Sequence, residues 1–145
     1  MTERHASVLV ADELLTSLNG KQVLSGIYTS DIVIPSSGTT TSQLVFFFII
    51  ETDIDAPFDE ITIELTLPGE PPISIPSPKL APPLSPGDRK KPSRQILRVP
   101  ALLNFPRLNA GKIQAKIIHD KGEINVAAPW IIDLSATDAQ PTPPV

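Results

Sequence analysis

Residues 42–51 read Ser-Gln-Leu-Val-Phe-Phe-Phe-Ile-Ile-Glu and form the most apolar stretch of this 145-residue chain. β-Branched and aromatic residues favour β-strands. Successive side chains of a strand point to opposite faces of its sheet, so seven consecutive apolar residues make both faces apolar. A membrane-spanning helix would need about 20 such residues. The stretch therefore predicts a central strand that is buried on both sides.

Other segments alternate between apolar and polar residues, as strands with one buried face do. Isoleucine and leucine occupy every second position of Glu60–Leu67, and Lys112–His119 has the same period. The same criteria predict further strands at Ser7–Ala11, Gln22–Ile34, Ile73–Ile75, Gln95–Leu103, Glu123–Ala127 and Trp130–Leu134. In Ala11–Leu18 a short helix competes with a strand, because its three leucines have helical spacing.

Many short strands separated by turn signals are typical of an all-β fold. We expect a single antiparallel immunoglobulin-like β-sandwich of about seven strands in residues 6–134, in which Asp120-Lys121-Gly122 connects a hairpin. Residues 1–5 are expected to be a flexible terminus. The nine prolines of 68–92 predict a proline-rich loop insertion, and 135–145 has the composition of a disordered tail.

Composition and motifs exclude several classes of function. The chain has no cysteine, so disulfides and cysteine-ligated metals are excluded. The net charge of −4 disfavours a nucleic-acid partner. No phosphate-binding glycine loop and no Gly-x-Ser-x-Gly elbow occur, and His119-Asp120 is interpreted as a turn pair. The apolar run Ser7–Ala11 is too short for a signal peptide. We therefore expect a soluble, cytoplasmic, non-enzymatic protein without a cofactor, a nucleic-acid partner or a membrane partner.

The charges are divided unevenly along the chain. Residues 1–70 contain two basic and eleven acidic residues, whereas residues 71–145 contain ten basic and five acidic residues. The two halves therefore carry net charges of −9 and +5. This asymmetry is compatible with charged partners, but opposite charges on neighbouring strands of one sandwich would produce it as well.

Within the acidic half, Asp53, Asp55 and Asp59 are the candidate ligands for a calcium ion. Calcium binds six to eight oxygen atoms, and loop aspartates two residues apart can supply several of them. The glycine found at the bend of known calcium loops is missing here. A solvated strand end that discourages edge pairing is the alternative interpretation.

Two parts of the chain resemble known bacterial proteins. Leu108–Ile118, followed by Asp120–Glu123 and Pro129–Ile132, resembles the closing hairpin of many bacterial β-sandwich modules. Ala11-Asp12 followed by Asn19–Tyr28 is similar to the start of a bacterial family of unknown function, whose members share alanine-aspartate, glycine-lysine and leucine-x-glycine there. The resemblance implies a small immunoglobulin-like sandwich and carries over no activity, substrate or catalytic residue.

These observations lead to the hypothesis of a protein-interaction or assembly module, whose partner is another protein or a second copy of the chain. The expected contact surface comprises the apolar pair Phe46 and Phe48 and the basic run Arg89, Lys90 and Lys91. The alternative is a β-sandwich that binds calcium or a carbohydrate. Trp130 is most simply a core or rim aromatic of the last strand, and it is a weak candidate for stacking on a sugar.

Overall fold

The structure is a computed structural model that describes residues 4–53, 58, 60–76, 94–120 and 122–135. The elements among these residues are thirteen β-strands, of which seven have five or more residues. In chain order they are β1 (His5–Thr16), β2 (Gln22–Ile27), β3 (Ile32–Ile34), β4 (Thr39–Thr40), β5 (Gln43–Asp53), β6 (Ile61–Thr66), β7 (Ile73–Pro76), β8 (Arg94–Asn104), β9 (Arg107–Leu108), β10 (Gly111–Lys112), β11 (Gln114–His119), β12 (Gly122–Val126) and β13 (Trp130–Asp133). The all-β prediction is confirmed.

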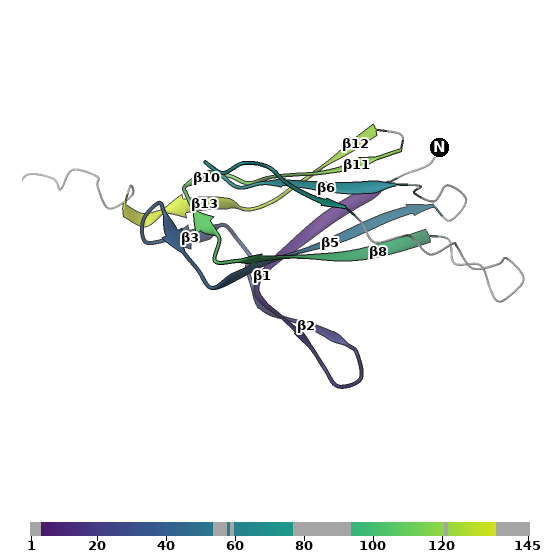
Figure 1. The fold of residues 1–145 in the computed structure, drawn as a ribbon, viewed down its shortest axis with the longest axis horizontal. Coiled ribbons are helices and arrows are strands. Elements are labelled where there is room, and N and C mark those ends of the chain that lie inside the picture. The colour runs from purple at the N-terminus through teal and green to yellow at the C-terminus, as the bar shows by residue number, and fades with distance from the viewer. Residues whose placement is uncertain (1–3, 54–57, 59, 77–93, 121, 136–145) are drawn as a thin grey trace, which may run out of the picture.

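The strands form several open sheets, two of which have four strands each. Sheet I has the order β2-β1-β5-β8 and sheet II the order β12-β11-β6-β7, and all pairs within both sheets are antiparallel. Figure 1 shows sheets I and II as two layers. A third sheet has the order β10-β13-β3, and β4 pairs with β9. The pair β13–β3 is parallel, so the expectation of purely antiparallel pairing is wrong at this one place.

The main core lies between the two layers and is built from alternate residues. Even-numbered residues of β5 belong to this core and are fully buried: Leu44, Phe46, Phe48 and Ile50. Sheet II contributes its own alternating set of buried residues: Ile61, Ile63, Leu65, Ala115 and Ile117. The period of two seen in the sequence is therefore the period with which the side chains enter this core.

The strand predictions hold along most of the described chain, with two differences. The helix that competed for Ala11–Leu18 does not form, because β1 continues to Thr16 and pairs with β2 there. The expected strand Gln22–Ile34 is divided into β2 and β3. Most of the predicted proline-rich loop and tail, residues 77–93 and 136–145, lies outside the described residues. Nowhere in the described chain is there a helix with the length and apolarity required to cross a membrane.

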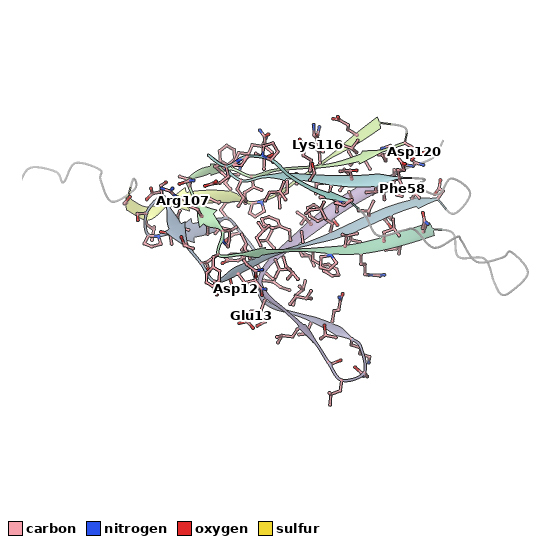
Figure 2. All side chains as sticks on the ribbon, in the orientation of Figure 1. Asp12, Glu13, Phe58, Arg107, Lys116 and Asp120 are labelled. Atoms are coloured by element: carbon pink, nitrogen blue, oxygen red, sulfur yellow. The ribbon has the colours of Figure 1, made fainter. Side chains whose placement is uncertain are left out.

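One end of the two layers is closed by the side chain of Arg4, which belongs to the segment 1–5 for which a flexible terminus is expected. The guanidinium donates hydrogen bonds to Thr52 of sheet I (3.2 Å), to Nδ1 of His119 in sheet II (2.8 Å) and to the Asp120 carboxylate (3.2 Å). It also lies 4.4 Å above the centre of the Phe58 ring. Figure 2 shows Phe58 and Asp120 together at this end. Because 8% of the Arg4 side chain is exposed, these charged contacts are made with little water nearby.

Replacing Arg4 by methionine should lower the free energy of unfolding by about 2–4 kcal/mol, because three polar groups lose a charged donor that is shielded from solvent. Urea unfolding would measure this loss. Arg107→Met is the matched control, since Arg107 is exposed on β9, and it should change the stability by less than about 0.5 kcal/mol. Equal effects of the two variants would show that Arg4 does not join the layers.

Candidate interaction surface

Phe46 and Phe48 cannot form the contact surface that their sequence suggested, because both side chains are fully buried. They lie on the face of β5 that meets sheet II, where Val10 is paired with Phe46 and Val99 with Phe48. Phe47 points to the opposite side of the strand. The apolar surface available to a partner is therefore on this other side, the outer face of sheet I.

The outer face of sheet I has a small apolar cluster of its own. Ala11, Val45 and Phe47 are buried there, yet they are not part of the core between the sheets. The strand register places a row of half-exposed aliphatic side chains around them, each with between 41% and 51% of its surface accessible: Leu9, Leu15, Val23, Ile27, Ile96 and Leu102. We call these six residues and the buried three the outer apolar face. A contiguous patch of accessible aliphatic residues of this kind is often a site of contact with another molecule.

Part of the outer apolar face is carried by a hairpin that projects from the body, which we call the arm (residues 12–27). Its strands are the second half of β1 and all of β2, and Gly20 with φ = 82° shapes the turn between them. Figure 1 shows the arm leaving the body on the side of sheet I opposite to sheet II. At its turn the side chain of Leu18 is fully exposed. The dipeptide Asn19-Gly20 at this turn is typical of a two-residue hairpin connection, but it does not indicate how long the two paired strands are.

The base of the arm is held by Asp12, Gly26 and Tyr28. The Tyr28 hydroxyl donates a hydrogen bond of 2.7 Å to the Asp12 carboxylate. Gly26 lies opposite Asp12 with φ = 71°, and a Cβ atom there would be 2.5 Å from Asp12 Oδ2. Partial burial and the neighbouring carboxylate raise the pKa of Tyr28 to about 12. Figure 2 places Asp12 and Glu13 where the arm leaves the body.

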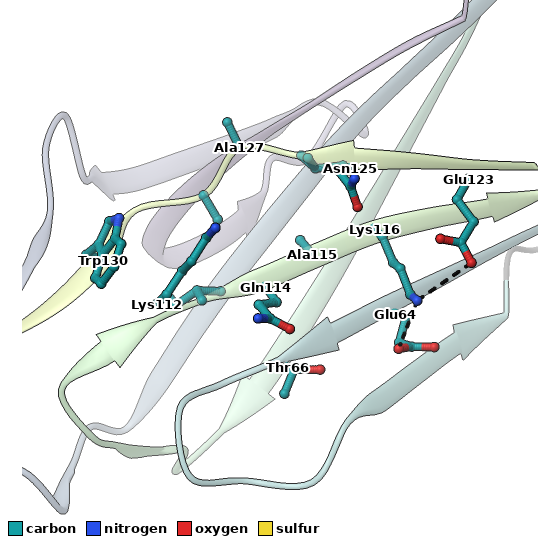
Figure 3. A pocket seen from close by; sticks show the side chains of 13 residues that line it. Glu64, Thr66, Lys112, Gln114, Ala115, Lys116, Glu123, Asn125, Ala127 and Trp130 are labelled. Carbon is teal, nitrogen blue, oxygen red and sulfur yellow. Dashed lines mark ion pairs between the residues drawn. The ribbon is translucent and has the colours of Figure 1, made fainter.

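The outer face of sheet II differs, since it is polar and contains a hollow of ≈ 720 Å³. Lys116 lies on β11 between two carboxylates, and its Nζ atom is 3.7 Å from Glu64 Oε1 and 3.7 Å from Glu123 Oε1. The dashed lines in Figure 3 mark these two ion pairs. The three charges largely compensate one another at this end of the hollow.

The opposite end of the hollow is formed by Trp130 and Lys112, as Figure 3 shows. Trp130 is 52% exposed, and its backbone N–H donates a 3.0 Å hydrogen bond to Asp31. The side chains of Gln114 and Asn125 line the hollow as well. An exposed indole beside amide groups can contact an apolar surface of a ligand and bind its hydroxyl groups. Trp130 therefore lies at the rim of the structure, one of the two positions expected for it.

The remaining predicted site residues are only partly covered by the structure. Asp53 is the last residue of β5, whereas Asp55 and Asp59 lie outside the described residues. Among the residues that are described, no three histidine or acidic side chains are placed to hold a metal ion together. The basic run at 89–91 also falls outside the described chain. The calcium hypothesis and the basic contact surface therefore stay predictions.

Gly26→Ala should open the arm far more than Gly20→Ala. Both glycines have positive φ, so each alanine adds about 1 kcal/mol of backbone strain. Only at position 26 does the new Cβ atom also displace the Asp12 carboxylate, which should raise the cost to about 2–3 kcal/mol. Amide hydrogen exchange of β2 measures the free energy of local opening. Equal losses of protection in the two variants would contradict the proposed packing of Asp12 on Gly26.

Tyr28 is the only tyrosine of the chain, so the absorbance of ionised tyrosine reports on it alone. We expect its titration near pH 12 in the folded protein and at a lower pH in Asp12→Asn, where burial remains as the larger cause of the raised pKa. Because the folded state keeps this proton longer than the unfolded state, the stability should fall as the pH rises from about 10 to about 12. A folded-state pKa near 10 would show that Asp12 does not bind the hydroxyl.

Comparison with known proteins adds no relative from which a function could be inferred. No family model matches the chain, and the searches of curated proteins and of solved structures found no match.

Proposed function

We propose that this chain is a non-enzymatic protein-interaction or assembly module with an immunoglobulin-like β-sandwich fold, and that it binds its partner through the outer apolar face of sheet I. The single observation that carries the proposal is the set of six half-exposed aliphatic residues that surround Val45 and Phe47 on this face. The stacking of two antiparallel sheets over one core supports the proposed sandwich.

The size of the outer apolar face fits this role. Its half-exposed residues leave on the order of 500 Å² of apolar surface in contact with water, which is the size of patches that are often functional. A standard protein–protein interface takes about 800 Å² from each partner, and roughly 60% of that area is apolar. The outer apolar face alone therefore supplies the apolar area that one partner contributes to such an interface.

The face also has the composition of an interface centre. The central part of the face comprises the rows between Arg98 and Glu13, which are its charged residues among those described from the row of Ser7 to that of Glu13. Ile96 lies beyond Arg98, and Leu15 and Val23 lie beyond Glu13. Between Arg98 and Glu13 lie only apolar side chains, with Phe47 at 8% exposure in the middle. Depletion of charge at the centre and its retention at the rim are typical of protein interfaces.

The double variant Leu9→Ser/Leu102→Ser tests this proposal, because both side chains are accessible and their loss should leave the core intact. We expect the variant to lose the complex that the parent protein forms, whether with itself in light scattering or with a protein retained on it from a lysate. The matched control is Val33→Ser/Ile132→Ser, two exposed aliphatic residues paired across β3 and β13. Retention of the complex in the Leu9/Leu102 variant, or its loss in the control, would contradict the proposal.

Carbohydrate binding at the hollow of sheet II is a second candidate, favoured by the exposed indole of Trp130 beside Gln114 and Asn125. Trp130 is the only tryptophan of the chain, so its fluorescence reports on this hollow alone. If the candidate is correct, a soluble cello-, chito- or malto-oligosaccharide changes the emission in a saturable way, and Gln114→Ala weakens that response at least tenfold. Unchanged emission with all three series would reject it.

A further inference from the structure

The arm carries apolar side chains on both of its faces. Leu14 is paired with Leu24 on one face, whereas Leu15 is paired with Val23 on the other. Leu15 and Val23 are 51% and 49% exposed, and Leu14 and Leu24 are half-buried. A two-stranded ribbon is only marginally stable in water unless a further strand or layer covers it. The face of the arm that carries Leu15 and Val23 is the more exposed of the two, and it therefore lacks a cover.

Sheet I, from which the arm departs, also has an apolar surface without a cover. Its outer apolar face extends from β8 across β5 to β1, and Leu15 continues it into the arm on the same side of β1 as Leu9 and Ala11, with Glu13 between Ala11 and Leu15. Figure 1 shows that the arm diverges on this outer side. The two apolar surfaces that lack a cover are thus neighbours in one molecule, and both are turned away from sheet II.

We infer that the occupant of this surface is a second copy of the same chain, and that two copies exchange their arms. In this arrangement the arm of each copy lies on the outer apolar face of the other copy's sheet I. The inference rests on the proposed function and specifies its partner. A two-fold interface of this kind uses the same surface on both subunits, so one contact covers both arms and both sheets.

The charges of the two contacting elements favour the exchange. The arm carries Asp12, Glu13 and Lys21, a net charge of −1, whereas β8 at the far side of the face has two arginines and no acidic residue. An arm that crosses from one copy onto the other brings its acidic base toward the basic strand. The acidic and basic halves of the sequence would then meet between subunits, and high salt should weaken the dimer.

The area of the contact also favours a second copy over an unrelated partner. The outer apolar face of one chain supplies about what one partner brings to a standard interface. A second copy contributes an equal area and, in its arm, a ribbon with two apolar faces. An unrelated partner would have to supply such a ribbon independently, whereas a second copy has it already.

The absence of cysteine allows a direct test of the exchange by single-cysteine cross-linking. Ser25→Cys places a thiol on the outer-face side of the arm, and Ser7→Cys places one on the outer face of sheet I. The two variants, one of them enlarged by a tag, are mixed and treated with a short bismaleimide. We expect a heterodimeric product. Ser74→Cys, exposed on β7 of sheet II, is the control and should yield none.

The mass in solution provides the second measurement, from micromolar to submillimolar protein. We expect a dimer for the parent chain at low salt and a single chain for Leu15→Ser/Val23→Ser, whose changes lie on the exposed arm and should not unfold the body. A parent dimer that persists in this arm variant, or that cross-links through Ser74→Cys, would overturn the exchange.

The same measurements separate failure of the inference from failure of the proposed function. In one outcome, the parent chain stays single at all concentrations but binds another protein, and Leu9→Ser/Leu102→Ser no longer binds it. This outcome would show that the occupant is not a second copy, and the proposed interaction surface would still stand. If the parent chain stays single and binds no protein whose binding depends on Leu9 and Leu102, both the inference and the proposed function are overturned.

Discussion

The apolarity of β5 on both faces is the constraint on which the rest of the structure depends. A strand of this kind has to be central in its sheet, because hydrogen-bonded neighbours on both sides and layers above and below are needed to remove it from water. β1 and β8 provide the neighbours, and sheet II covers the even-numbered residues. The odd-numbered residues Val45 and Phe47 are left with a rim of half-exposed aliphatic side chains as their cover. The body of the protein and its contact surface therefore follow from the same seven residues.

The extent to which the sequence predicts this structure differs between its parts. Strands with a strict period of two, such as Glu60–Leu67, were predicted with nearly correct bounds, because their polar residues show which face is wet. In the run of apolar residues 44–50 no polar residue marks a face, so Phe46 and Phe48 could not be distinguished from Phe47. The three leucines of Ala11–Leu18 were ambiguous for another reason. Their conformation is decided by pairing with β2, which is a property of the hairpin and not of the segment.

The candidate sites also depend on contacts that the local sequence does not reveal. Nothing near Arg4 in the sequence indicates that it binds His119 and Asp120, because the contacts join opposite ends of the described chain. The groups at the base of the arm lie close together in the sequence, but nothing in the sequence shows that Asp12 contacts both Gly26 and Tyr28. The strand register supplies the physical reason: a carboxylate that bonds the tyrosine hydroxyl lies directly over a residue that has no Cβ atom.

The contacts of Arg4 also constrain the order in which the protein is completed during synthesis. Arg4 and Asp120 are 116 residues apart, so the ribosome makes the acceptor long after the donor has left the exit tunnel. Sheet I cannot be finished earlier either, because β8 pairs with β5 only after the intervening proline-rich segment has been made. The nascent chain consequently exposes the apolar β5 strand, with β1 as its only hydrogen-bonded neighbour, from the completion of β5 until β8 has been made. A factor that shields emerging apolar segments would act on this protein during that interval, and its task would end when the Arg4 contacts close.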